Sequence, residues 1–138
     1  MFLTNAVLRF LAPRATVRAH CDLPCGIYDP EQARIEAESC YKIVEKYAAN
    51  DDVAFRTRAI AIKEQRAELV KHHLWVLWTD YFKPPHFEKY PELHGLFNDT
   101  IKQASGTGAK QSMDPADGQK LLDNIKEIDR IFWETKKA

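Results

Sequence analysis

Apolar residues recur at steps of three and four along most of the chain, which is the period of a helix that buries one face. The first such pattern follows Asp29 and Pro30. Asp can accept hydrogen bonds from the free N–H groups of a first turn, and Pro suits the first helical position. Asn50, Asp51 and Asp52 end this helix and can cap the next one. Its apolar stripe is Ala33, Ala37, Cys40, Tyr41, Val44, Tyr47 and Ala48.

A longer pattern predicts a second helix over residues 53–82, about 45 Å in length, which the Lys-Pro-Pro sequence at 83–85 breaks. Its apolar positions are Ile62, Leu69, Val70, Leu74, Leu77, Trp78 and Tyr81. A third helix is expected from Pro91 to Ile101, before a polar loop that begins with Ser-Gly-Thr-Gly at 105–108.

Asp114 and Pro115 repeat the start signal of the first helix, and a fourth helix follows to the basic end at Lys136 and Lys137. Its apolar positions are Leu121, Leu122, Ile125, Ile128 and Phe132. Four amphipathic helices with short connections predict an all-α fold, an antiparallel four-helix bundle over residues 29–138.

The chain has 138 residues, the size of one domain, and its 20 Lys and Arg balance its 20 Asp and Glu. Zero net charge argues against a general nucleic-acid binder, which needs a basic face. Every apolar run is shorter than the roughly 18 residues that cross a bilayer, so no membrane partner is expected. Three cysteines are too few for a disulfide scaffold and suit a reducing compartment, which favours a cytoplasmic protein.

Residues 1–19 contain three Arg and no acidic residue, whereas residues 20–138 contain 17 basic and 20 acidic residues. Three interpretations of this leader are open: a secretory signal, an organellar transit peptide, or a propeptide removed in the cytoplasm. A secretory signal fits poorly, because the basic start is missing and Arg9 interrupts the apolar stretch. Ala19 is small enough to precede a cleavage point in any of the three.

The sequence HCDLPCGIYDP at residues 20–30 lies before the first helix and outside the apolar pattern. His20, Cys21 and Cys25 are its metal-binding side-chain types. The two cysteines could form a small disulfide loop or half of a zinc site. A structural zinc site needs four ligands, however, and the rest of the chain offers no second pair with suitable spacing.

Cleavage after Ala19 would complete a different ligand set. His20 would then offer a free amine and an imidazole, Cys21 an amide nitrogen and a thiolate, and Cys25 a second thiolate. Two nitrogens and two sulfurs fit a square plane with the imidazole on the axis, which suits nickel(II) or copper(II) rather than zinc. Because the amine is a peptide amide until the cut, this set favours the propeptide interpretation.

The hook sequence HCDLPCGIYDP, together with KEQRAELVKHH, DYFKPPHFEKYPELH and IFWETKK, resembles the nickel-containing superoxide dismutase family. The resemblance covers residues 20–138, and the leader ending APRATVRA is similar to the propeptides of that family. It implies a four-helix bundle assembled as a homohexamer with one nickel ion per subunit. It also implies conversion of two superoxide anions to dioxygen and hydrogen peroxide by cycling between nickel(II) and nickel(III). Three departures are Ile27 in place of a common Val, the additional Cys40, and a leader that begins a few residues early.

The resemblance also assigns roles to individual residues. It makes His20, Cys21 and Cys25 the nickel ligands and has Glu36 and Arg66 hold the His20 imidazole. Tyr28 and Tyr81 would guard the approach to the metal, order water near it and supply hydrogen bonds to peroxide.

Each residue outside the hook also has a plainer interpretation: a solvated helix face for Glu36, an ion pair within the helix for Arg66, and core packing for Tyr81. Arg66 and Tyr81 are fifteen residues apart on one predicted helix, about 22 Å along its axis. If both act at a metal site, one of them reaches the hook of a neighbouring subunit.

The sequence therefore predicts a superoxide dismutase precursor with a propeptide at 1–19, a hook at 20–28 and a helical bundle after it. Its partners would be superoxide, the processing protease and further copies of the chain. The alternatives are a non-catalytic nickel or copper carrier and a plain helical interaction module.

Overall fold

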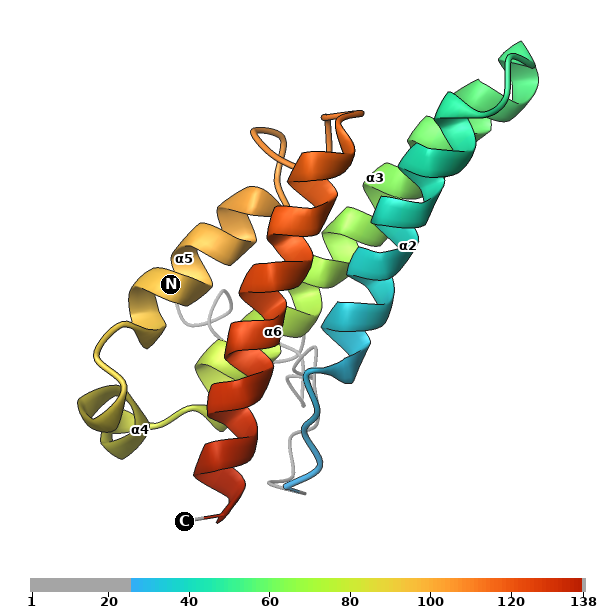
Figure 1. The fold of residues 1–138 in the computed structure, drawn as a ribbon. Coiled ribbons are helices and arrows are strands. Elements are labelled where there is room, and N and C mark those ends of the chain that lie inside the picture. The colour runs from blue at the N-terminus through green and yellow to red at the C-terminus, as the bar shows by residue number, and fades with distance from the viewer. Residues whose placement is uncertain (1–25, 138) are drawn as a thin grey trace, which may run out of the picture.

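The computed structural model describes residues 26–137, all of whose regular structure is helical. Figure 1 shows the long helices packed side by side, with α2 and α3 antiparallel and α6 passing in front of α3. The elements are α2 (Glu31–Ala48), α3 (Val53–Val76), the π-helical turn η1 (Leu77–Tyr81), α4 (Pro84–Lys89), α5 (Leu93–Gln103) and α6 (Pro115–Lys137). This arrangement confirms the predicted helical bundle.

Side-chain caps at the helix starts match those expected from the sequence. The Asp29 carboxylate accepts a hydrogen bond from the Glu31 N–H at 2.9 Å, and the Asp52 carboxylate accepts one from the Phe55 N–H at 2.7 Å. The Asp114 carboxylate accepts one from the Ala116 N–H at 2.9 Å. Each carboxylate satisfies an N–H that has no partner within its own helix.

Small residues line the contact between α2 and α3. Ala33, Ala37 and Cys40 on α2 and Ala59 and Ala67 on α3 are all buried. Short side chains at these positions allow the two backbones to approach closely. The connected ends of the two helices extend beyond the end of α6 (Figure 1).

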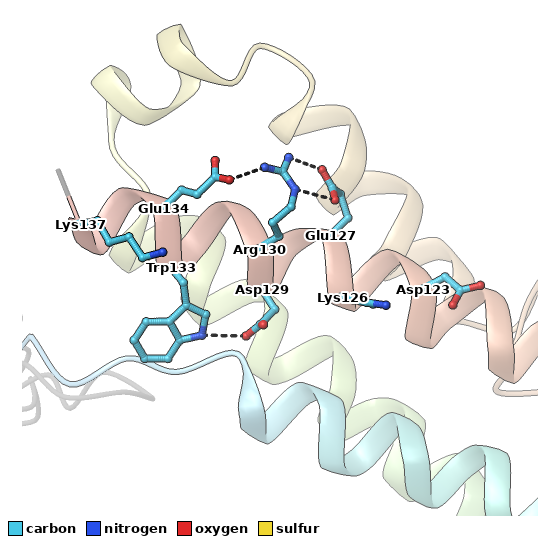
Figure 2. A pocket seen from close by; sticks show the side chains of 8 residues that line it. All are labelled: Asp123, Lys126, Glu127, Asp129, Arg130, Trp133, Glu134 and Lys137. Atoms are coloured by element: carbon cyan, nitrogen blue, oxygen red, sulfur yellow. Dashed lines mark hydrogen bonds and ion pairs between the residues drawn. The ribbon is translucent and has the colours of Figure 1, made fainter.

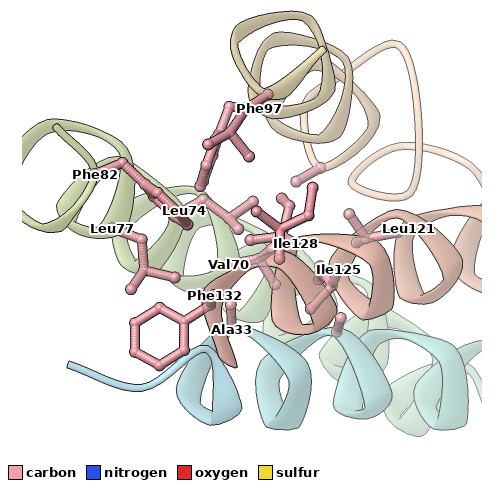
Figure 3. Close-up of a cluster of buried hydrophobic side chains, with 14 of the residues drawn as sticks. Ala33, Val70, Leu74, Leu77, Phe82, Phe97, Leu121, Ile125, Ile128 and Phe132 are labelled. Carbon is pink, nitrogen blue, oxygen red and sulfur yellow. The ribbon is translucent and has the colours of Figure 1, made fainter. Parts of the chain in front are cut away.

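Larger side chains fill the space between α3, α5 and α6, and Figure 3 shows them meeting in one cluster. Phe97 of α5 and Phe82 close one side of the cluster, and Ala33 of α2 lies on the other. Its largest members include Val70, Leu74, Leu77, Phe82, Phe97, Leu121, Ile125, Ile128, Ile131 and Phe132. The helix faces predicted from periodicity therefore supply the core.

The second predicted helix is interrupted at its C-terminal end. After Val76 the chain forms the wider turn η1, where the Phe82 N–H donates to the Leu77 carbonyl at 3.0 Å. Pro84 and Pro85 then open the short helix α4 rather than a plain loop, with proline in the first positions where no N–H is required. The sequence pattern indicated neither η1 nor α4.

Lys63 is a buried charge on the apolar side of α3. Its ammonium donates hydrogen bonds to the carbonyls of Ala109, Lys110 and Ser112 at 2.7–2.8 Å. Burial lowers the pKa of this ammonium below its usual value. Three carbonyl partners satisfy all three donors, so Lys63 holds the connection between α5 and α6 against α3.

No helix within the described part of the chain is both long enough and apolar enough to cross a lipid bilayer.

Candidate metal centre

The predicted nickel ligands His20, Cys21 and Cys25 lie outside the residues that the structure describes. The described chain begins at Gly26, directly after Cys25, where φ is +72° in the left-handed region that suits glycine. The Gly26 carbonyl accepts a hydrogen bond from the Lys136 ammonium at 3.3 Å. Gly26, the first described residue, therefore lies beside the C-terminal end of α6.

Residues 26–137 contain no group of three His, Cys, Asp or Glu side chains arranged to hold a metal ion. The donor types in the hook are two thiols, an imidazole and the amine that cleavage would expose. These nitrogen and sulfur donors fit planar nickel(II), and each must lose its proton to bind.

Tyr28 and Tyr81 lie against each other although they are far apart in sequence. Their ring centroids are 5.6 Å apart and the ring planes are tilted by 52°. Tyr28 is three residues after Cys25, the last predicted ligand, so this contact places Tyr81 beside the segment that follows that ligand. The structure therefore brings together the two tyrosines that the resemblance singled out.

An aromatic cage fixes the ring of Tyr81. Its centroid lies 4.4 Å from that of Phe132, 4.9 Å from that of Phe82 and 5.7 Å from the imidazole of His86. The Lys136 ammonium lies 5.1 Å from the centroid of the same ring, a favourable cation–π arrangement. Tyr81 thus packs in the core and also reaches the edge of the bundle beside Tyr28.

His86 supports this cage and caps α4. Its Nδ1 accepts a hydrogen bond from the Lys83 N–H at 3.2 Å. Burial lowers the pKa of His86, and the nearby Lys83 charge lowers it further. Both causes favour the neutral imidazole, which is the form that can accept this bond at Nδ1.

Glu36 and Arg66 form an ion pair between α2 and α3. Arg66 Nη1 lies 3.2 Å from Glu36 Oε2 and 3.4 Å from Glu36 Oε1. The Glu36 side chain is 16% exposed and that of Arg66 is 37% exposed, so Glu36 is not on a solvated face. Glu68, a candidate partner of Arg66 within the helix, pairs with Lys71 and Lys110 instead.

The Arg66 guanidinium has a further N–H that is not used in this ion pair. Its Nε is buried and has no hydrogen-bond partner among residues 26–137. A buried N–H without a hydrogen-bond acceptor costs free energy. The Arg66 Nε–H is therefore suited to donate to a further acceptor beside the Glu36–Arg66 ion pair.

Cys40 is buried at the contact between α2 and α3, where its thiol donates to the Lys63 carbonyl at 3.5 Å. Burial raises the pKa of this thiol to about 12. A neutral, enclosed thiol is unreactive, so Cys40 acts as a small core residue, as predicted.

A groove along the exposed side of α6 also contains several charged residues (Figure 2). Arg130 bridges Glu127 and Glu134, and the Trp133 N–H donates to Asp129 at 3.0 Å. These pairs join residues three or four positions apart on a single helix, as is typical of a solvated face.

Three residues that surround Tyr81 were not predicted from the sequence: His86, Thr135 and Lys136. Thr135 and Lys136 are 54 and 55 positions from Tyr81, and neither has a local motif that marks it. Only the packing of the end of α6 against η1 brings them to the tyrosine pair.

The fold defines the class as a small protein built from a helical bundle. Residues 15–136 match the family described as nickel-containing superoxide dismutase, and the chain belongs to that family. It is 70% identical over 130 residues to the superoxide dismutase (Ni) of Streptomyces coelicolor, covering 94% of this chain and 98% of that protein. It is 68% identical, with the same coverage, to the superoxide dismutase (Ni) of Streptomyces seoulensis.

Solved structures agree with this assignment. A native nickel superoxide dismutase structure superposes with a TM-score of 0.82 at 71% identity and covers 86% of this chain and 100% of its own. A structure whose nickel ligation corresponds to the oxidised state gives 0.82 at 70% identity with the same coverage. The chain is thus an oxidoreductase of the superoxide dismutase class with a nickel cofactor, which confirms the predicted activity and metal.

Proposed function

We propose that His20, Cys21 and Cys25 hold the nickel ion and that Tyr28 and Tyr81 guard its approach. The contact between Tyr28 and Tyr81 carries this proposal, because it ties the segment that follows Cys25 to a fixed point in the core. Bound nickel would supply the one-electron chemistry, alternating between nickel(II) and nickel(III). In the overall reaction two superoxide anions and two protons give dioxygen and hydrogen peroxide.

The protein's own residues would orient the ligands and control access. The Glu36 carboxylate would accept a hydrogen bond from the ring N–H of His20 and set the direction of the imidazole, as carboxylates do for metal-bound histidines. Arg66 would hold Glu36 through the ion pair at 3.2 Å. The tilted rings of Tyr28 and Tyr81 would exclude molecules larger than superoxide and peroxide.

A cut between Ala19 and His20 would create the active chain, with residues 1–19 as the propeptide, 20–28 as the hook and 29–138 as the bundle. The native solved chain is matched over its full length yet covers 86% of this chain. Residues 20–138 make up that same fraction of the sequence. This agreement supports removal of a leader of 19 residues by a processing protease.

Assembly into a homohexamer is part of the proposal. Arg66 and Tyr81 are separated by about 22 Å of helix, and the ends of α2 and α3 extend beyond α6. A hook contacted by both residues would therefore take one of them from a neighbouring copy. Metal-bound thiolates suit a reducing compartment, which supports a cytoplasmic location.

Three versions of the chain test the proposed ligand set: residues 1–138, a chain trimmed to begin at His20, and a matched control that begins at Ala19. The control retains the imidazole and both thiols and removes only the free amine of His20. We expect about one nickel per chain and rapid superoxide decay only when His20 is the first residue. Equal metal content and activity in the control would contradict a role for the amine.

The thiolate roles have a separate test. Cys21→Ser and Cys25→Ser should each abolish superoxide decay while the helical circular dichroism spectrum is retained, because both residues precede Glu31, where the described helices begin. Full activity in either variant would refute the assignment. Nickel binding by the trimmed chain without superoxide decay would favour the alternative function, a nickel or copper carrier.

A further inference from the structure

The phenol of Tyr81 makes one polar contact within the described part of the chain. Its oxygen lies 2.7 Å from the Oγ1 of Thr135 in the last turn of α6. The same Thr135 Oγ1 lies 2.6 Å from the backbone carbonyl of Phe132. The three oxygen atoms therefore form a chain that runs from the phenol to the hydroxyl and on to the carbonyl.

The direction of the protons in this chain follows from the donors available. A carbonyl has no proton, so the close contact between Thr135 and Phe132 requires the threonine hydroxyl to donate. A threonine hydroxyl has only one proton, and this contact uses it. The contact between Tyr81 and Thr135 is then a hydrogen bond only if the Tyr81 phenol donates to Oγ1.

We infer that Thr135 is a positioning residue that fixes the direction of the Tyr81 phenol proton, an inference that rests on the proposed function of the tyrosine pair. The proton points toward α6, and Tyr81 presents its oxygen lone pairs on the side away from Thr135. Tyr81 therefore accepts a hydrogen bond from water or hydrogen peroxide there. It does not donate one to superoxide.

The surroundings of Tyr81 keep this arrangement in place. The ring is held between Phe132 and Phe82 at 4.4 and 4.9 Å, so it cannot swing away from α6 without disturbing the core. Phe132, which supplies the terminal carbonyl, is itself fully buried. The acceptor, the ring and its packing surface thus belong to the same packed end of the bundle.

The test replaces the threonine by residues of similar shape. Thr135→Val removes the hydroxyl and keeps the side-chain volume, whereas Thr135→Ser keeps the hydroxyl. Thr57→Val is the matched control, because the Thr57 hydroxyl makes the same kind of helix contact, to the Val53 carbonyl at 2.8 Å. Thr57 is exposed and lies near the start of α3, at the opposite end of that helix from η1 and Tyr81. Thermal unfolding of all three variants establishes that they fold.

The first measurement needs no activity. Ultraviolet resonance Raman spectra contain a tyrosine doublet whose relative intensities differ between donating and accepting phenols, and subtraction of the Tyr81→Phe spectrum isolates Tyr81. In both the nickel-free and the nickel-loaded protein we expect a donor signature for the parent chain and Thr135→Ser. Thr135→Val should lose that signature. An acceptor signature in the parent chain, or no change in Thr135→Val, would overturn the inference.

The second measurement is the rate of superoxide decay after pulse radiolysis. Thr135→Val should lower the rate constant by roughly five- to tenfold, the size of one neutral hydrogen bond, and Thr135→Ser should remain within about twofold of the parent chain. Thr57→Val should leave it unchanged. A parent chain with the donor signature and no dismutase activity would refute the proposed function instead, so the two failures are distinguishable.

Discussion

Glu36 and Arg66 are 30 residues apart in sequence, and their side chains meet with Arg66 Nη1 3.2 Å from Glu36 Oε2. The pair joins α2 to α3 next to the small residues that bring these helices together. The other carboxylate oxygen, Glu36 Oε1, makes only a long hydrogen bond, at 3.4 Å from the same Nη1. Glu36 therefore has capacity to accept a further hydrogen bond, such as one from the imidazole of His20.

Glu36→Gln should leave the nickel content of the processed protein unchanged and slow superoxide decay, because a neutral amide orients an imidazole less strongly than a carboxylate. The stability loss should stay near 1 kcal/mol, since the partly exposed Arg66 is screened by solvent. Glu38→Gln is the control on the same helix, since Glu38 pairs with Arg34 on an exposed face. A normal rate for Glu36→Gln in superoxide decay assays would argue against the orienting role.

Lys63→Met should lower the free energy of unfolding by about 3 kcal/mol in urea titrations. The substitution removes the buried ammonium and leaves the carbonyls of Ala109, Lys110 and Ser112 without their hydrogen-bond donor. Hydrogen exchange should rise most in residues 104–113. Lys126→Met, at an exposed position of α6, is the control and should change stability by less than about 0.5 kcal/mol. Equal stability of the two variants would contradict the anchoring role of Lys63.

His86 should make the protein less stable as the pH falls. Because the pKa of His86 is lower in the folded chain than its ordinary value of 6.5, the unfolded chain binds the proton first on acidification. The contribution of neutral His86 is therefore fully present above pH 6.5 and is lost as the pH falls below it.

The melting temperatures of the parent chain and His86→Asn, at about pH 7.5 and about pH 5.5, measure this contribution. Asparagine offers an amide oxygen near the Nδ1 position and does not titrate. We expect a smaller drop in melting temperature between the two pH values for His86→Asn. An identical drop would assign the acid sensitivity to other groups.

Cys40 should resist modification in the folded protein. Of the three cysteines, we expect Cys21 and Cys25 to react with iodoacetamide once nickel is removed, and Cys40 to react only after unfolding, because burial raises its pKa to about 12. Mass spectrometry of the alkylated peptides identifies the modified residues. Rapid alkylation of Cys40 in the native protein would show that the contact between α2 and α3 opens readily.

The long helices could be predicted because their information is local. An apolar residue at every third or fourth position defines a buried face, and Asp before Pro marks a start, whatever the rest of the chain does. The π-helical turn η1 and the short helix α4 have no such local pattern. They arise where the end of α3 adjusts to the core around Phe82 and Phe97.

The sequence by itself determined the helical bundle, the donor types of the hook and the family, because each of these depends on residues close together in the chain. Only the tertiary structure decided that Glu36 meets Arg66, that Lys63 is buried against the connection at 109–112, and that the Tyr81 phenol contacts the Thr135 hydroxyl. These contacts join residues 30 to 54 positions apart. A periodic pattern shows which face of a helix is buried, but the partner on the opposite helix depends on how the helices pack.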